Sequence, residues 1–220
     1  MRISDRIELR ALMLLSSLFP EYQNLQKNDK PDLVDFERSI GVEVTDAVSK
    51  DIMQGESYYQ KHLKNEEFES CTKESIKKLK KVGLKPTYQK SENGIRFGKP
   101  IGLLRVFGIE ELDLLHEAIK NKYSKKYKDL RSLDLYILFS QMCLSSINDR
   151  EFEKLLCTAH ECEKTYGIVF QKIMIDFIGD IEILNLKNDK ITSLHYDRDN
   201  FSKLYEERVM EIENGEKERE

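Results

Sequence analysis

The sequence has no tryptophan, and its 220 residues include only 10 glycines, 4 prolines and 4 cysteines. So little glycine and proline excludes a collagen-like chain and a disordered low-complexity chain. The composition is 35% charged and 40% hydrophobic, which favours a helix-rich globular protein. A chain of this length can also bury a core of useful size.

The sequence also lacks any run of the ~20 apolar residues that are needed to span a bilayer. Residues 1–19 start basic and continue into an apolar run, but Asp5 and Glu8 interrupt it and no small-residue cleavage site follows. We therefore interpret this segment as a core helix and not as a signal peptide. Without a secretory signal, the four cysteines are expected to be reduced thiols of a cytoplasmic protein that does not bind membranes.

The formal net charge is −4, which gives no global argument for a nucleic-acid partner. The charges are nevertheless uneven: residues 72–99 hold nine Lys and Arg against two Glu, and residues 120–131 hold six against one Asp. Residues 197–220 hold nine acids against five bases. An acidic protein can therefore present a basic surface, although a set of solvated helix faces would explain the same runs.

The second basic run interleaves aromatic residues with lysines. Tyr123 and Tyr127 are four residues apart, so they share one face of a helix. Lys122, Lys125 and Lys126 could follow the phosphates of a nucleic acid while the tyrosines stack on bases. The alternative is the basic end of a surface helix, where cations suit the helix dipole.

Hydrophobic periodicity and turn signals predict alternating helices and strands. Helices are expected at residues 5–19, 46–66, 69–82, 109–127, 149–165 and 199–213. Strands are expected at about 32–36, 40–45, 133–139, 168–178 and 181–186, and a strand–turn–strand unit within 84–107. This order predicts a mixed sheet with helices on its faces. We expect one α/β domain over residues 1–198, followed by a C-terminal helix and acidic tail over 199–220.

The segment KPDLVDFERSIGVEVT predicts a hairpin that carries acids in unusual places. Side chains alternate along a strand, so the valines that flank Glu43 share a core face and Glu43 lies on the other face. A four-residue loop, with Asp35 opposite Ile40, would bring Asp32 opposite Glu43 on the same face. A three-residue loop would instead put Asp32 opposite Val44 and separate the two acids.

Two neighbouring carboxylates repel each other unless a proton or a cation neutralises them. Mg²⁺ prefers oxygen ligands and is often held by one or two carboxylates together with substrate phosphate. The residues alone leave two alternatives open for Asp32 and Glu43. They form a divalent-metal site, or they point into solvent from an uncovered face of the sheet.

Pro31-Asp32, ten intervening residues and then Glu43-Val44-Thr45 resemble the motif of the PD-(D/E)xK nuclease superfamily. In that motif Pro-Asp on one strand precedes Asp/Glu-x-Lys on the next. The resemblance implies an α/β, restriction-endonuclease-like fold, with a mixed central sheet flanked by helices and an αβββαβ core.

The resemblance is close over residues 5–60 and looser through residues 133–139. It implies that Asp32 and Glu43, helped by the carbonyl of Val44, bind a catalytic metal ion. The expected cofactor is Mg²⁺ or Mn²⁺.

Thr45 stands where the family has a lysine that helps to activate the attacking water, and threonine carries no positive charge. In this superfamily the lysine sometimes lies on the next helix, where Lys50 is the nearest candidate. Lys50 shares a helical face with Gln54 and Lys61, and we expect Lys61 to contact nucleic acid. Glu8, on the first helix, is expected near the metal; the alternative is a salt bridge at the start of that helix.

The resemblance thus implies a metal-dependent nuclease that hydrolyses DNA phosphodiester bonds, with a homodimer among the assemblies considered. Because the lysine is missing from its usual position, a second hypothesis is a catalytically inactive nuclease-like fold that binds nucleic acid or a protein. A third hypothesis is an interaction protein whose acidic tail binds a basic partner.

Overall fold

The computed structural model of the chain describes residues 2–48, 50–70, 72–82, 84–90, 93–94, 96–105, 112–127, 130–139 and 147–217. Contacts between Cα atoms divide the chain into two compact units. Unit 1 consists of Met1–Ala47 with Leu115–Glu220, and unit 2 consists of Val48–Leu114. The expected boundary between residues 1–198 and the C-terminal segment 199–220 stays a prediction.

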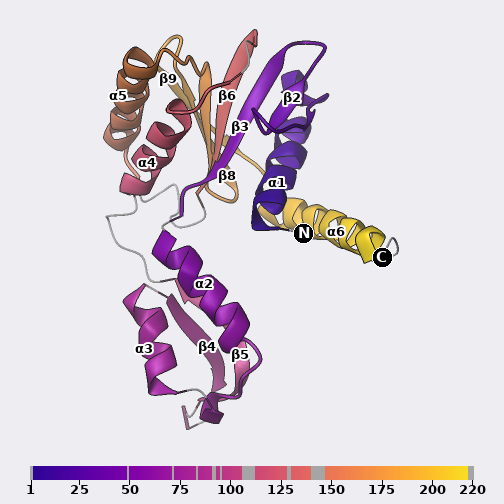
Figure 1. Ribbon diagram of the computed structural model, residues 1–220, viewed down its shortest axis with the longest axis vertical. Helices are drawn as coiled ribbons and strands as arrows, with labels where there is room; N and C mark the ends of the chain where they lie inside the picture. The colour runs from indigo at the N-terminus through magenta and orange to yellow at the C-terminus, as the bar shows by residue number, and fades with distance from the viewer. Residues whose placement is uncertain are drawn as a thin grey trace. The chain divides into compact units, whose positions relative to one another are not determined.

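Unit 1 is built on a seven-stranded mixed sheet in the order β1-β2-β3-β6-β7-β8-β9 (Figure 1). Its strands are β1 (Gln26–Lys27), β2 (Leu33–Asp35), β3 (Ile40–Asp46), β6 (Ser132–Leu138), β7 (Lys172–Asp176), β8 (Asp180–Asn185) and β9 (Lys190–His195). The central strands β3, β6 and β7 are parallel, and the outer pairs are antiparallel. The structure therefore confirms the mixed α/β class that the sequence predicts.

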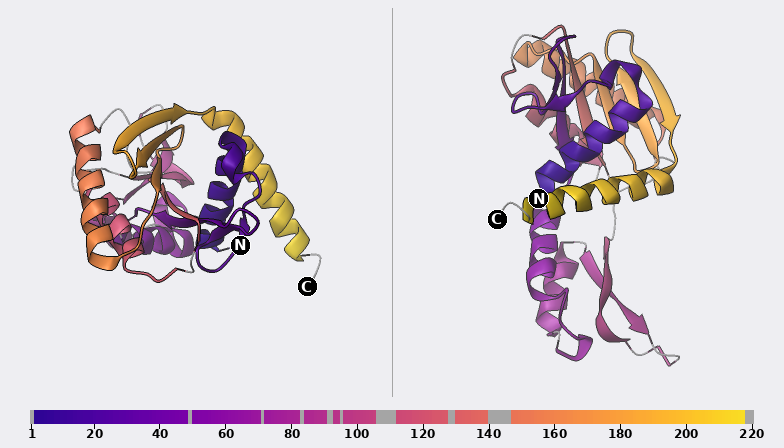
Figure 2. Two further views of the ribbon diagram at one scale, coloured as in Figure 1. Left: turned by 90° about the horizontal axis from the view of Figure 1, so that it is seen from above. Right: turned by 90° about the vertical axis from the view of Figure 1, so that its right-hand side faces the viewer.

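Helices cover both faces of this sheet. They are α1 (Ile3–Leu18), α4 (Leu112–Tyr123), α5 (Asp149–Tyr166) and α6 (Arg198–Lys217), with a short 3-10 helix at Pro20–Tyr22. The α4 and α5 connections join parallel neighbours, which need such crossovers. Seen from above, α5 lies on one side of the sheet and α1 and α6 lie on the other (Figure 2). No helix among the described residues is long and apolar enough to cross a membrane.

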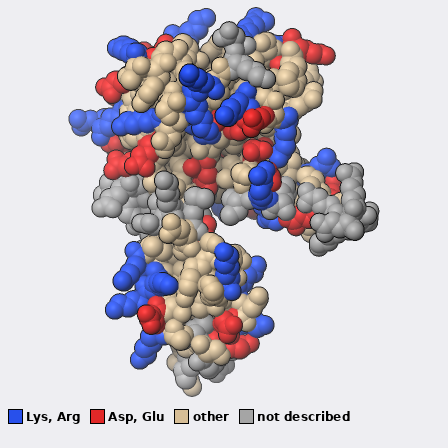
Figure 3. All heavy atoms as spheres, viewed as in Figure 1, with Lys and Arg blue, Asp and Glu red and all other residues tan. Residues whose placement is uncertain are grey.

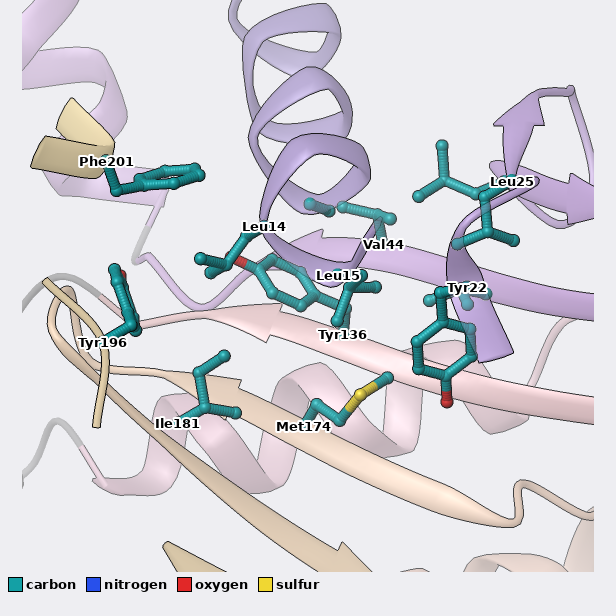
Figure 4. Packing of buried hydrophobic residues seen from close by; sticks show 13 residues of the cluster. Leu14, Leu15, Tyr22, Leu25, Val44, Tyr136, Met174, Ile181, Tyr196 and Phe201 are labelled. Carbon is teal, nitrogen blue, oxygen red and sulfur yellow. The ribbon is translucent and has the colours of Figure 1, made fainter. Parts of the chain in front are cut away.

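The sheet face under α1 forms the main core cluster. Leu14 and Leu15 of α1 pack against Val44, Tyr136 and Met174 of the three parallel strands (Figure 4). Alternation in β3 sends the flanking valines into this cluster and Glu43 to the opposite face, as expected from the sequence. The two sheet faces thus receive different residues from the same strand.

A second buried feature on the α1 side is the Asp176 network, made of Asp176, Arg10, Tyr136 and Tyr196. Asp176 is fully buried at the end of β7 and accepts hydrogen bonds from Arg10 Nε (2.9 Å), Tyr136 OH (2.5 Å), Tyr196 OH (2.8 Å) and the Ile178 amide (2.7 Å). Both carboxylate oxygens therefore have partners.

Unit 2 is a smaller α/β structure inserted between β3 and α4. It contains α2 (Lys50–His62), a 3-10 turn (Phe68–Ser70), α3 (Lys73–Lys81) and the antiparallel pair β4 (Leu84–Lys90) and β5 (Arg96–Arg105). Its core cluster consists of Tyr59, Leu63, Leu79 and Leu84. Gly94, at a φ of +74°, lies in the turn between the strands, in agreement with the predicted Asn-Gly turn.

Candidate metal and phosphodiester site

The β2–β3 hairpin has the register that brings its two acids together. Asp35 pairs with Ile40, so the loop between the strands has four residues, 36–39. The last ladder pair is Leu33 with Val42. The same register extended by one residue puts Asp32 opposite Glu43, as the four-residue alternative predicts.

Asp32 immediately precedes β2, at a level of the sheet where β3 continues past its last ladder pair with β2. Its Oδ2 accepts a hydrogen bond from the backbone amide of Val44 at 2.7 Å. The carboxylate therefore satisfies an amide that the shorter strand leaves open. This bond also fixes the Asp32 side chain beside the Glu43–Val44 peptide.

Gly41 allows the hairpin to approach the residue that precedes Asp32. A Cβ atom at position 41 would lie 2.5 Å from Pro31 Cγ and would also overlap a methyl group of Leu130. Any larger residue would therefore push Pro31 and Asp32 away from β3. The glycine before the Glu43 motif is thus a positioning residue for the site.

Glu43 is 1% exposed and faces α4. Its Oε1 accepts hydrogen bonds from Lys122 Nζ at 2.6 Å and from Lys125 Nζ at 2.9 Å. Lys122 Nζ also donates to the Val44 carbonyl at 2.6 Å and lies 3.8 Å from Asp32 Oδ2. The three residues expected to bind metal therefore surround one buried ammonium group. We call Asp32, Glu43, Val44, Lys122 and Lys125 the acid–lysine site.

Lys122 is buried because α4 carries it inward with the apolar stripe of the helix. Leu115, Ile119 and Tyr123 are fully buried, and Lys122 follows Ile119 by three residues. From the sequence we expect Lys122 to contact phosphate at the surface. In the structure the residue is only 8% exposed, and its ammonium group lies against two carboxylates. A lysine within an apolar stripe is the signal that sequence reasoning missed.

Burial and neighbouring charge shift the pKa values of these groups. Burial raises the pKa of Asp32, and the nearby Glu43 carboxylate raises it further. Burial lowers the pKa of Lys122, although Glu43 and Asp32 oppose that shift. Burial would also lower the pKa of Lys125, but its hydrogen bond to Glu43 and the charges of Glu43 and Asp32 together outweigh burial, so the pKa is raised. The positive charge of Lys125 is therefore stabilised, whereas Lys122 loses its proton more easily.

One oxygen of the site has no partner. Glu43 Oε2 is buried and makes no hydrogen bond to any residue that the structure describes, although a buried carboxylate oxygen is normally satisfied. The site also contains the Asp32 carboxylate and the Val44 carbonyl, and oxygen donors are the ligands that Mg²⁺ prefers. Within the described residues, no group of three or more His, Cys, Asp or Glu side chains is placed to hold a metal.

The other residues expected in unit 1 are Glu8, Thr45 and Lys126. Glu8 on α1 forms a salt bridge with Lys27 at 3.2 Å, and its charge contributes to the raised pKa of Asp32. Thr45 is half-buried on β3, and alternation places it on the same face as Glu43. Lys126 is exposed, beyond the end of α4.

The two tyrosines near α4 do not form an exposed stacking surface. Tyr123 is fully buried, with its ring centroid 4.8 Å from that of Phe170. Tyr127 contacts the same phenylalanine at 5.7 Å and donates a hydrogen bond to the Lys122 carbonyl at 3.0 Å. These tyrosines therefore hold the end of α4 in place beside Glu43.

Two expected residues belong to unit 2. Lys50 is the first residue of α2, and its side chain lies outside the described residues. Lys61 is exposed in the last turn of α2. Among the described side chains, the lysines that contact the acids are Lys122, from the crossover helix, and Lys125, just after it.

No protein-family model, no curated protein and no solved structure matches the chain. The function therefore has to be inferred from the chemistry of the site.

Proposed function

We propose that the protein is a metal-dependent nuclease that hydrolyses DNA phosphodiester bonds, with Asp32 and Glu43 as metal ligands. The observation that carries this proposal is the convergence of Glu43 Oε1, Asp32 Oδ2 and the Val44 carbonyl on one buried point, which the Lys122 ammonium occupies. The second oxygen of Glu43, Oε2, is buried without a partner among the described residues. Such a buried, unpaired oxygen costs free energy unless a ligand completes it.

The order of elements supports a restriction-endonuclease-like core. Without unit 2, the chain runs through α1, then β1, β2 and β3, then α4 and β6. This is a helix, three strands, a helix and a strand, as in the αβββαβ core that the motif implies. In this proposal the acid–lysine site lies on its second and third strands and its second helix.

The proposed metal ligands are Asp32, Glu43 and the Val44 carbonyl, and the metal is Mg²⁺ or Mn²⁺. When bound, such an ion lowers the pKa of a coordinated water and stabilises charge on the phosphate. Asp32 is held ready by its bond to the Val44 amide. Lys125 keeps a positive charge beside Glu43, where it can interact with an approaching phosphate.

Lys122 supplies the amine that Thr45 cannot. It lies 2.6 Å from Glu43 Oε1, and burial lowers its pKa, so its Nζ can release a proton and accept one from water near the acids. We assign to Lys122 the role expected of the motif lysine, and Lys50 is the alternative from the sequence.

Plasmid cleavage with Mg²⁺ or Mn²⁺ tests this proposal. We expect Asp32→Asn and Glu43→Gln to lower the cleavage rate at least about 100-fold, because each removes a charged ligand. Glu37→Gln is the matched control: it is an exposed glutamate in the loop of the same hairpin, and cleavage should not change. Circular dichroism should show that all three variants are folded. Equal cleavage by the wild type and both acid variants would refute this site.

A second candidate function is a nuclease-like fold that has lost catalysis and binds nucleic acid or a protein. The observation that favours it is the Lys122 ammonium, which bonds the same oxygens that would bind metal. Calorimetric titration with Mn²⁺ separates the two candidates. Heat of binding that disappears in Glu43→Gln supports the nuclease, whereas no binding by the wild type supports the inactive fold.

The proposal also includes a homodimer and a cytoplasmic location. The two described cysteines, Cys157 and Cys162, are free thiols. Binding of a basic partner by the acidic tail stays a prediction. Its test is the deletion of residues 207–220.

A further inference from the structure

The outward side of α3 in unit 2 is a row of exposed lysines. Thr72 caps this helix through a hydrogen bond from the Ser75 amide to its hydroxyl at 3.1 Å, and Leu79 is 1% exposed within the core of unit 2. Because Leu79 faces inward, the polar residues of the helix face outward. The exposed lysines are Lys73, Lys77, Lys78, Lys80 and Lys81. Lysine and arginine side chains gather along this side of unit 2 (Figure 3).

We call these five lysines the α3 lysine row, and no described acid neutralises them through an ion pair. None of them forms an ion pair with a residue that the structure describes, and Lys78 alone contacts an aromatic ring, that of Tyr58 at 4.8 Å. Lys73, Lys77 and Lys81 follow one another at intervals of four residues, where like charges repel. An external anion would remove this repulsion.

The charge of unit 2 differs in sign from that of the rest of the chain. Unit 2 holds 13 Lys and Arg against 10 Asp and Glu, and the rest holds 23 against 30. Within residues 73–105 there are ten basic residues and two acids. The positive charge is therefore concentrated in the inserted unit, on and after α3.

We propose that the α3 lysine row binds the phosphate backbone of duplex DNA without reading its sequence. Lys73 and Lys81 are eight residues apart, about 12 Å along a helix. One DNA strand carries about three or four phosphates over that length, so the row matches the spacing of backbone charge. Lysine is a point charge on a flexible stem, which suits phosphates more than base edges. The choice of DNA as the polyanion rests on the proposed nuclease function.

The test is a binding measurement on the full chain with catalysis removed. Glu43→Gln is combined with Lys73→Gln, Lys77→Gln and Lys81→Gln, and the anisotropy of a labelled duplex is followed over about 50 to 250 mM salt. Glutamine keeps helix propensity close to that of lysine, so α3 should remain folded. The matched control replaces three exposed lysines of unit 1, Lys187, Lys190 and Lys203, by glutamine, which changes net charge equally.

We expect the α3 triple variant to bind at least about tenfold more weakly near 0.1 M salt, and the slope of log K against log salt to fall by about 2 to 3. The control variant should lose much less binding affinity. Equal losses in both triple variants would overturn the proposal, because net charge alone would then explain binding. Dependence on α3 with duplex RNA but not duplex DNA would overturn the assignment of DNA.

The binding and cleavage results separate this proposal from the nuclease proposal. Binding that depends on α3, together with a wild type that never cleaves, would support the role of the α3 lysine row and refute the nuclease proposal. Cleavage by the wild type, together with unchanged binding by the α3 triple variant, would support the nuclease proposal and refute the role of the α3 lysine row. Wild type in EDTA replaces the Glu43→Gln background if that variant does not fold.

Discussion

Glu43 and Asp176 are both buried acids of the parallel strands, and each contacts a cation, yet their surroundings differ. Asp176 receives four hydrogen bonds, spread over both oxygens. Glu43 receives two, both on Oε1, and its other oxygen has no partner. A fully satisfied acid holds a structure together, whereas a half-satisfied acid keeps capacity for a ligand. The difference separates a structural network from a candidate site within one sheet.

The strongest test of this comparison removes the satisfied acid. Asp176→Ala should lower the free energy of unfolding by about 3 to 5 kcal/mol, because it leaves the Arg10 guanidinium buried without its carboxylate. Urea denaturation followed by circular dichroism measures the loss. A change below about 1 kcal/mol would show that the Asp176 network does not stabilise the fold.

Lys122→Met removes the central cation of the acid–lysine site. The free energy of unfolding should fall by only about 1 to 2 kcal/mol, because Lys125 still bonds Glu43 and the lysine no longer has to be desolvated. Cleavage should fall at least about 100-fold, because the proposed proton acceptor is lost. Unfolding and cleavage assays on one preparation measure both effects. A stability loss as large as that of Asp176→Ala would mark the site as a structural ion-pair cluster.

Gly41→Ala tests whether the site depends on close packing in the hairpin. The new methyl group overlaps Pro31 and Leu130, so stability should fall by about 1 to 3 kcal/mol and cleavage should fall with it. Gly215→Ala is the control: nothing lies within 4 Å of its Cβ position in α6, and alanine favours helix. Thermal melting compares the two. Equal melting temperatures would contradict the role given to Gly41.

Tyr196→Phe should have the smallest effect. It removes one of the four donors to Asp176 and should lower the free energy of unfolding by about 0.5 to 1.5 kcal/mol, with cleavage unchanged. Tyr166→Phe, at a residue that is 51% exposed, should be neutral. Reduced cleavage in Tyr196→Phe at unchanged stability would mean that the Asp176 network also supports the site.

The hairpin illustrates what local sequence determines. Alternation and loop length left two registers for the hairpin, and the structure has the one in which Asp35 pairs with Ile40. The exposed edge strand β9 was not predicted, because Lys190–His195 buries no face and so leaves no clear apolar pattern. Local patterns therefore define strands well only where one face is covered.

The position of Lys122 illustrates what local sequence does not determine. Its neighbours in the chain are basic, so the charge pattern indicates a solvated helix end. The contact with Glu43 joins residues 79 positions apart and depends on how α4 packs on the sheet. A tertiary contact of this kind decides whether a lysine binds phosphate or completes a site. The run of basic residues alone does not predict which of the two occurs.

The place of unit 2 in the chain has a consequence for how such a protein can diversify. Unit 2 begins after β3 and ends in the first turn of α4, and the pairing of β3 with β6 lies wholly within unit 1. Insertions at such loops are tolerated because the surrounding elements already pair and pack. Unit 2 is therefore an exchangeable module. Replacing it would change the binding surface that α3 provides, while the residues of the acid–lysine site stay the same.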